Sequence, residues 1–418
     1  MVGRAPATTG WRRHDVTERD LDAAIRRMAQ TRINRRGFLA ATGLGATGAL
    51  LAACSSNGSG ASTASSTAAS AAPSGAPSAE ASAAPAAEVE KELFMYNWAA
   101  YVSPDNMDLY KEQFGVETFT YDVYDNNEVL IAKLQGGASG YDIAAPTAEY
   151  VPGMVEEGFL QKLDLSRIPN TKYINKTFKG LWWDPTDEYQ VPKDYGTTGI
   201  LYMKSKISKI PQSWREFYEM VKGEASGKTV FVDSMGDVFV FPLKMLGYSL
   251  NSTDKNELEE ARKILLEVAP HLYALDSNEY GFKMKDGTSV LTLGWTGPLG
   301  QELTDEHTSG EAGYVVPSEG TLFWLDTWVM LAEAPHPNAA YAWLNFIHEP
   351  EVQGEETNYN LYATPNDAAM EFVKPEILAD TAIFPPENVI ASLEGAQDTS
   401  GNNQRIDIWE EFKQKIGG

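Results

Sequence analysis

Leu93-Phe94-Met95-Tyr96 is the first of three predicted strands in a stretch that ends at Tyr141-Asp142-Ile143-Ala144-Ala145. Between them, Ser103-Pro104 supplies a serine N-cap and a proline at the first helical position, and the helix that they open ends near Gly115. The order strand, helix, strand, helix, strand predicts a parallel α/β unit. Its strands are expected at 93–96, 116–123 and 141–145, and its helices at 103–114 and 125–135.

A second set of strands and helices follows this unit. Trp214, Phe217 and Val221 fall on one face of a predicted helix, so we expect them to pack into a core. The 365 residues after position 53 exceed one comfortable hydrophobic core and predict two domains. The further strands are expected at 199–203, 229–232, 290–293 and 321–325, and the further helices at 212–221, 237–246, 257–268, 338–347, 350–359 and 406–416.

The N-terminal part of the chain resembles an export signal. Arg35-Arg36-Gly37-Phe38-Leu39 resembles a twin-arginine motif, and the apolar run 38–53 is too short and too rich in glycine for a membrane-spanning helix. Leu51-Ala52-Ala53-Cys54 resembles a bacterial lipobox, and Cys54 is the only cysteine. We therefore expect residues 1–53 to be a signal peptide of the twin-arginine route. Cys54 would carry lipid at the outer face of the cell membrane or in the periplasm; the alternative is a chance cysteine after a signal sequence.

The charge of the chain limits what it can bind. Its first 53 residues hold nine arginines and four acidic residues; the whole chain carries −24, so the part from Cys54 onward carries −29. Such an acidic body excludes nucleic-acid binding through phosphates, and an anionic lipid surface would repel it without a covalent anchor. Residues 54–90 are almost wholly Ala, Ser, Thr, Gly and Pro and are expected to be a disordered tether. Translation could start at Met1 or Met28.

The motifs of common enzymes are missing from the sequence. Neither H-E-x-x-H nor G-x-S-x-G occurs, so a zinc site or a Ser-His-Asp hydrolase is poorly supported. The segment 223–229 looks like a P-loop but is one residue short, and a turn entering a strand is the simpler interpretation. We expect no catalytic residue, metal or cofactor, and a binding protein rather than an enzyme. The histidines are few: His14, His271, His307, His336 and His348.

Aromatic and acidic side chains instead gather where the predicted strands end. In open α/β sheets, ligands bind just beyond the carboxyl ends of the strands, so these side chains are candidates for a binding site. They occur at equivalent places in both halves of the chain. In chain order they are Trp98, Tyr101, Thr147, Glu149, Asp233, Ser234, Asp237, Trp295, Trp324 and Asp326.

Several short motifs, each weak alone, together have the order and spacing of one family. They are Tyr96-Asn97-Trp98 with Tyr101-Val102, Tyr141-Asp142-Ile143 leading to Pro146, Leu246-Gly247-Tyr248-Ser249, Phe323-Trp324-Leu325-Asp326, Tyr362-Ala363-Thr364-Pro365-Asn366 and Ile408-Trp409-Glu410-Glu411. From about Leu93 onward the chain resembles the bacterial spermidine/putrescine-binding proteins of ABC importers, a branch of the extracellular solute-binding proteins. The resemblance implies a type II periplasmic-binding-protein-like fold, with two α/β lobes and a hinge. Lobe 1 would comprise 91–196 and 326–365, and lobe 2 would comprise 197–325 and 366–418.

The resemblance also implies roles for individual residues. Asp326 would pair with an amine of the ligand, and Asp237 stands where the family usually has Glu. Ser234 replaces a second acid of spermidine binders, and Glu149 stands where such proteins have an aromatic residue. Whether Glu149, and Asp233 beside Ser234, turn toward the ligand stays open. The aromatic wall and the sandwich around the methylene chain would be formed by Trp98, Tyr101, Trp295, Trp324 and Tyr362.

These residue types suit a polyamine, which alternates cations with methylene groups. Carboxylates give buried ammonium groups charge-assisted hydrogen bonds, and indole faces bury methylenes and attract cations. We therefore expect a monomeric receptor that binds a polyamine and passes it to a membrane permease. The alternatives are the same fold with another small solute, such as a cationic amine or a phosphonate, and, more remotely, an exported enzyme with paired carboxylates.

Overall fold

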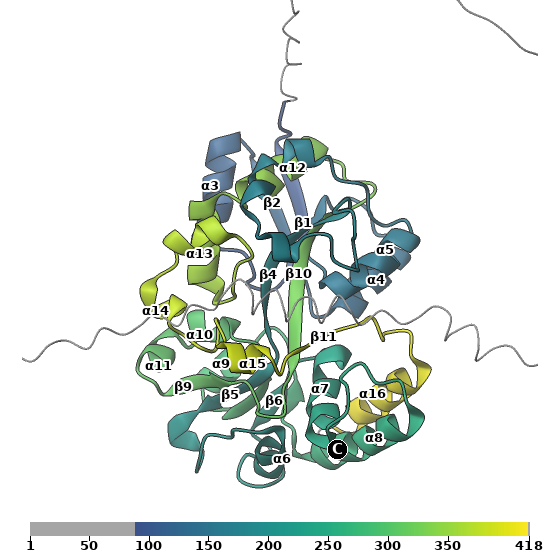
Figure 1. The fold of residues 1–418 in the computed structure, drawn as a ribbon, viewed down its shortest axis with the longest axis vertical. Coiled ribbons are helices and arrows are strands. Elements are labelled where there is room, and N and C mark those ends of the chain that lie inside the picture. The colour runs from purple at the N-terminus through teal and green to yellow at the C-terminus, as the bar shows by residue number, and fades with distance from the viewer. Residues whose placement is uncertain (1–87, 417–418) are drawn as a thin grey trace, which may run out of the picture. The chain divides into compact units, whose positions relative to one another are not determined.

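The computed structural model describes residues 88–416. The expected signal peptide, lipidated Cys54 and tether up to residue 87 lie outside the described residues. The residues from Val89 onward belong to one compact unit that contains two β-sheets. Each sheet with its helices is called a lobe below, so that the site can be placed relative to both (Figure 1).

The first lobe contains a mixed six-stranded sheet. β1 is parallel to its neighbours β2 and β3, as the sequence predicted for the first unit. β10 is antiparallel to β3 and β4 and parallel to β11, in the order β11-β10-β3-β1-β2 with β4 also paired to β10. The strands are β1 (Glu92–Trp98), β2 (Thr118–Tyr124), β3 (Ile143–Ala144), β4 (Gln190–Thr197), β10 (Leu322–Met330) and β11 (Glu394–Gly395).

The helices of the first lobe begin and end at residues that sequence rules favour. Pro104 opens the first of them after the N-cap Ser103, and Gly115 ends it in the left-handed conformation with a φ of 68°. Asn126 caps the next helix by accepting a hydrogen bond from the backbone of Val129. The helices are α3 (Pro104–Phe114), α4 (Asn127–Gln135), α5 (Val151–Glu156), α12 (Pro337–Phe346) and α13 (Pro350–Asn360).

The second lobe is built on a mixed five-stranded sheet in the order β7-β6-β8-β5-β9. As predicted, Trp214, Phe217 and Val221 are fully buried on one face of their helix, which Ser213 caps. Its strands are β5 (Gly199–Met203), β6 (Thr229–Phe231), β7 (Ala274–Leu275), β8 (Leu291–Gly294) and β9 (Ala312–Val315). The remaining helices are α6 (Trp214–Lys222), α7 (Met235–Leu246), α8 (Lys255–Val268), α9 (Tyr280–Lys285), α10 (Gly297–Gly300), α11 (Thr304–Thr308), α14 (Pro375–Leu378), α15 (Glu387–Ile390) and α16 (Asn403–Lys415).

The chain passes between the lobes more than once. It leaves the first lobe where β4 runs into β5 through Thr198, and it returns where β9 is followed by β10. After α13, β11 pairs with β10 in the first lobe's sheet, and the chain then ends in the second lobe, where α16 packs on α8. The paired strands β4 and β10 lie side by side at this crossing (Figure 1). The exact lobe limits expected from the sequence stay a prediction.

The structure corrects one expected boundary that matters for the site. The strand expected at 321–325 continues to Met330, so Asp326 lies within β10 and not at the end of a strand. The pairing of β10 with β4 shifts register between Leu325 and Thr327, and Asp326 forms a bridge with Thr147 instead. An irregularity of this kind re-aims a side chain, which is how an acid comes to face a cavity from a buried strand.

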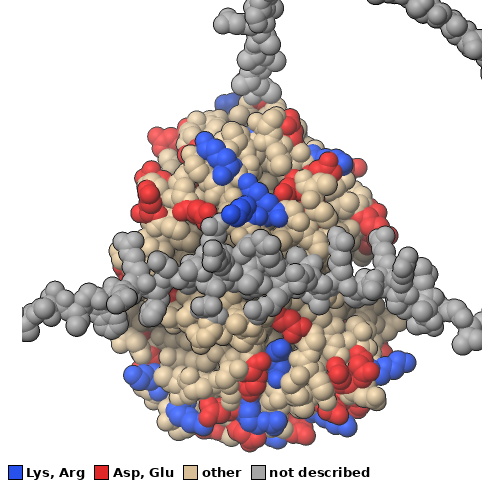
Figure 2. All heavy atoms as spheres, viewed as in Figure 1, with Lys and Arg blue, Asp and Glu red and all other residues tan. Residues whose placement is uncertain are grey.

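Charged side chains are distributed over both lobes on the face seen in Figure 2. Acidic groups are more numerous there and basic groups are interspersed among them. The excess of negative charge is therefore not confined to one patch of this face. Among residues 88–416, no helix has the length and apolar character needed to cross a membrane.

Candidate functional site

A cavity that is partly open to solvent is lined by residues from both lobes. Every ligand residue expected from the sequence lines this cavity except Asp233. Residues from widely separated parts of the chain therefore meet at one place. Those that the structure brings together are Trp98, Tyr101, Thr147, Glu149, Asp237, Trp295, Trp324, Asp326 and Tyr362.

Asp326 is a buried carboxylate with polar neighbours on one side of the cavity. The Tyr101 hydroxyl donates a hydrogen bond of 2.7 Å to its Oδ2, and the side chain of Thr147 also hydrogen-bonds it. Burial raises the pKa of Asp326 to about 7, although these hydrogen bonds and the charge of Lys193 oppose the rise. Only 7% of Asp326 is exposed, so a cation in the cavity would stabilise its ionised form.

Asp237 is a second buried acid, contributed by the first turn of α7. Thr198 and Ser234 donate hydrogen bonds to its two oxygens, and Trp295 Nε1 donates one of 3.1 Å to Oδ1. Burial nevertheless raises the pKa of Asp237. Ser234, which stands where spermidine binders have a second acid, also caps α7. Its hydroxyl therefore holds Asp237 in place.

Among the acids Glu149, Asp237 and Asp326 of the cavity, Glu149 has the fewest side-chain partners. Burial raises its pKa well above the usual range, and the carboxylates of Asp326 and Asp237 add to the rise. Among the described residues, no other side chain forms a hydrogen bond or ion pair with Glu149. A cation in the cavity would favour the ionised form of Glu149, since burying an unpaired charge is costly.

Aromatic rings from both lobes form the walls of the cavity. Trp98 and Trp295 meet edge to face with their ring centroids 5.8 Å apart. Tyr362 packs in the same manner against Tyr101, at 5.5 Å, and against Trp324, at 5.1 Å. Such rings bury methylene groups and attract cations to their faces.

Two glycines make room for these rings. A Cβ atom on Gly196 would lie 2.5 Å from the indole of Trp324, and one on Gly297 would lie 2.5 Å from the hydroxyl of Tyr362. Only glycine allows both rings to lie where they do without a shift of the surrounding backbone.

Asp233 is placed differently from the other expected residues. It follows β6, but it is not among the residues that line the cavity. Its backbone carbonyl accepts a hydrogen bond from Asn126, and its backbone N–H donates one to Ser277. Its role in ligand binding stays a prediction.

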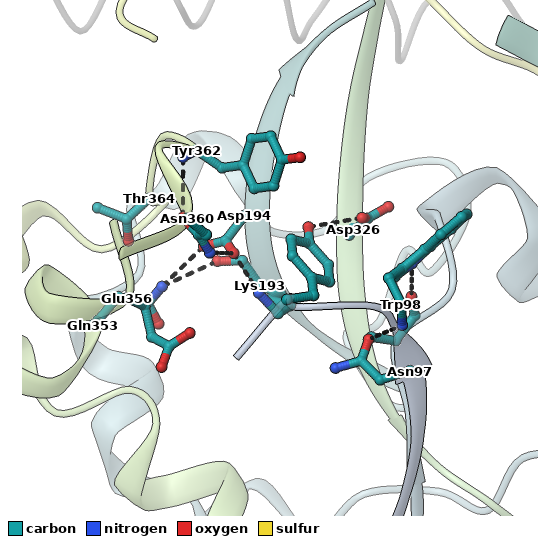
Figure 3. A network of polar contacts seen from close by, with 12 residues as sticks. Asn97, Trp98, Lys193, Asp194, Asp326, Gln353, Glu356, Asn360, Tyr362 and Thr364 are labelled. Atoms are coloured by element: carbon teal, nitrogen blue, oxygen red, sulfur yellow. Dashed lines mark hydrogen bonds and ion pairs between the residues drawn. The ribbon is translucent and has the colours of Figure 1, made fainter. Parts of the chain in front are cut away.

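The sequence analysis missed several groups that support the site. Asn127 hydrogen-bonds both the side chain and the backbone of Thr147, so it fixes the partner of Asp326. Behind Tyr101 lies the buried pair Lys193 and Asp194, which Figure 3 shows with its neighbours. An asparagine at a helix start carries little signal, and a charged pair in the middle of a strand argues against burial, so neither stood out.

This geometry defines a class of protein. Two α/β lobes enclose a cavity with fixed acids and aromatic walls, and the described residues hold no group of three or more metal-ligating side chains. The arrangement is that of a two-lobed receptor for a small solute.

Comparison with known proteins establishes the family. The model of the bacterial extracellular solute-binding proteins matches residues 107–385. The chain belongs to this family and has its two-lobed fold. The chain is 30% identical over 341 residues to a putrescine/cadaverine-binding protein of Pseudomonas aeruginosa, and the match covers 78% of this chain and 95% of the relative.

Two further relatives are similar over a comparable length. A spermidine/putrescine-binding periplasmic protein of Escherichia coli is 29% identical, with 79% of this chain and 92% of the relative covered. A solved structure from Listeria monocytogenes, described as a putative spermidine/putrescine ABC transporter, superposes with a TM-score of 0.71 at 29% identity. That superposition covers 78% of this chain and 99% of the other.

Proposed function

We propose that this protein is an extracytoplasmic receptor that binds a polyamine of the putrescine and spermidine class between its lobes and delivers it to an ABC importer. One observation carries the proposal: Glu149, Asp237 and Asp326 line one cavity whose walls are aromatic rings from both lobes. The names of the relatives, all polyamine-binding proteins, support the same ligand class.

The chemistry of the cavity matches the chemistry of such a ligand. Asp326 and Asp237 are both buried and both have raised pKa values, so each gains stability from an ammonium group. The indoles of Trp98 and Trp295 provide apolar surface for the methylene chain between the amines. A phosphonate or another anion would meet repulsion from the same carboxylates.

Arg405 is a buried cation among the residues that line the cavity. It donates hydrogen bonds to the carbonyls of Leu250 and Ser252. Its positive charge reduces the negative charge that the cavity presents to a cationic ligand.

Export and anchoring complete the proposed function. The motif around Arg35-Arg36 would direct the chain to the twin-arginine route, and Cys54 would carry the lipid. A covalent anchor is needed because the acidic body would not stay at an anionic membrane by itself. The protein would act as a binding protein and not as an enzyme.

Calorimetry on the purified protein tests the proposed ligand. The protein is first unfolded, washed and refolded to remove any carried-over ligand. It is then titrated with putrescine, cadaverine, spermidine and spermine, and with a neutral diol of matched length as the control. We expect saturable binding of at least one amine and none of the diol. Binding of none of the amines would contradict the proposal, and binding of a different cationic amine alone would redirect it to that solute.

A further inference from the structure

A buried ion pair lies behind the cavity wall, in strand β4. Lys193 is 1% exposed and Asp194 is fully buried, and the two side chains contact each other. Neither residue lines the cavity. A buried pair of this kind contributes little to stability, because the cost of desolvating both charges offsets their attraction. Its position therefore calls for another explanation.

Lys193 lies directly under one of the cavity rings. Its ammonium nitrogen is 3.4 Å from the centroid of the Tyr101 ring, and the hydroxyl of that ring donates to Asp326 at 2.7 Å. Tyr101 thus contacts a buried cation through its ring face and the proposed ligand carboxylate through its hydroxyl. The attraction between the ammonium and the ring face fixes the ring plane, and with it the direction of the hydroxyl.

Asp194 connects the pair to a second cavity ring. Asn360 donates a 3.0 Å hydrogen bond from Nδ2 to Asp194 Oδ2 and accepts one of 3.0 Å from the backbone N–H of Tyr362. Gln353 donates to the other oxygen of Asp194 at 3.0 Å, so both oxygens are held. These bonds fix the start of the segment that presents the Tyr362 ring to the cavity (Figure 3).

We propose that Lys193 and Asp194 are positioning residues for ligand binding: together they orient the rings of Tyr101 and Tyr362, and so hold Asp326 ready for the ligand cation, without touching the ligand. This inference rests on the proposed function for the roles of Tyr101 and Asp326. Hydrogen bonds to both oxygens of Asp194 and the contact of Lys193 with the Tyr101 ring favour one arrangement of the neighbouring residues, which is what a preorganised site needs.

The test replaces the pair with uncharged residues of similar size, Lys193→Met with Asp194→Asn. We expect the affinity for putrescine to fall at least tenfold. The control is Arg262→Met with Glu411→Gln, which removes a pair between α8 and α16 and should leave the affinity within twofold. Lys193→Arg keeps a cation on the ring and should bind within threefold of the unaltered protein.

A double-mutant cycle separates positioning from general damage to the fold. In a Tyr101→Phe background, the hydroxyl no longer reaches Asp326, so only the contribution through Tyr362 remains. Loss of the pair should therefore weaken binding by a smaller factor than it does in the unaltered protein. An equal loss in both backgrounds would overturn the proposal. If the double replacement does not fold, Asn360→Ala keeps the ion pair and cuts only the connection to Tyr362. It should weaken binding at least threefold, and unchanged affinity would also overturn the proposal.

A measurement without ligand keeps this inference apart from the proposed function. The protein is labelled with 3-fluorotyrosine, and the Tyr101 resonance is assigned with Tyr101→Phe. Replacing the pair should shift or broaden the Tyr101 signal and leave that of Tyr248, which follows α7 and hydrogen-bonds Glu260, unchanged. An unchanged Tyr101 signal would refute the positioning role even if putrescine binds. A changed signal together with no binding of any polyamine would refute the proposed ligand alone.

Discussion

Trp98 and Trp295 meet edge to face at a centroid distance of 5.8 Å, and they come from different lobes. Trp98 ends β1, and its indole N–H donates to the carbonyl of Ala145. Trp295 follows β8, and its indole N–H donates to Asp237. Each ring is thus tied to its own lobe, and their contact closes one wall of the cavity. Opening the lobes would separate the two rings.

Trp295→Phe tests the indole of the second lobe. The ring is kept but the hydrogen bond to Asp237 is lost, so we expect putrescine affinity to fall about tenfold, as one charge-assisted bond of roughly 1.5 kcal/mol implies. Trp295→Ala should cost more, because the apolar wall is lost as well. Calorimetry measures both variants against Trp182→Phe, outside the cavity, as the matched control. Equal affinities of all three would remove Trp295 from the site.

Asp326→Asn is expected to act in opposite directions on binding and on stability. Binding should weaken by more than tenfold, because the amide carries no charge for the ammonium group. The ligand-free protein should become more stable at pH 8, by up to about 4 kcal/mol, because a buried carboxylate with a raised pKa destabilises the folded state when ionised.

Thermal unfolding and calorimetry check both effects on the same sample. Glu112→Gln, an exposed acid outside the cavity lining, is the control and should change neither quantity substantially. If Asp326→Asn left the affinity unchanged, the assigned ligand contact would be wrong.

The affinity for putrescine should decrease as the pH falls below 7. The pKa of Asp326 is raised to about 7 in the ligand-free protein, so below that pH the carboxyl is protonated and must release its proton to pair with a cation. We expect Kd to rise up to tenfold per unit as the pH falls from 7 to 6, and to level off above pH 8. Titrations in buffers with different ionisation enthalpies would show proton release. The slope should be smaller in Asp326→Asn, and a Kd independent of pH would contradict the account.

Cys54 offers a separate prediction about location. Cys54→Ser should release the protein from the membrane fraction into the soluble extracytoplasmic fraction, because no lipid can be attached. Replacing Arg35 and Arg36 by lysine should instead keep it inside the cell. Fractionation and immunoblotting distinguish the two results. Membrane attachment that persists in Cys54→Ser would contradict the proposed anchor.

Local sequence patterns predicted the limits of strands and helices where apolar side chains alternate or where a helix has capping residues. The strand at 199–203 has the predicted limits, and the helix after Ser103-Pro104 ends at the predicted glycine. Strand β4 was not predicted at all. It contains Pro192, Lys193 and Asp194, which are atypical of a buried strand, and their burial is explained only by partners that come from α13 and the segment after it.

In the candidate site too, local sequence patterns predicted some features, whereas features that depend on contacts between distant segments were not predicted. The residue types at strand ends, together with the family resemblance, pointed to the residues that line the cavity. The position of Asp326 at a register shift was not predictable, because it depends on how β10 pairs with β4 and bridges to Thr147. The supporting pair behind Tyr101 was also hidden, since no short-range pattern links residue 193 to residue 101.

A crystal structure of the protein grown with putrescine tests the central claim most directly. We expect one amine nitrogen within hydrogen-bonding distance of a carboxylate oxygen of Asp326. The methylene chain should lie against the indoles of Trp98 and Trp295. The account would be contradicted if density for the diamine appeared elsewhere on the protein. It would also be contradicted if Asp326 kept only its Tyr101 and Thr147 partners at saturating putrescine.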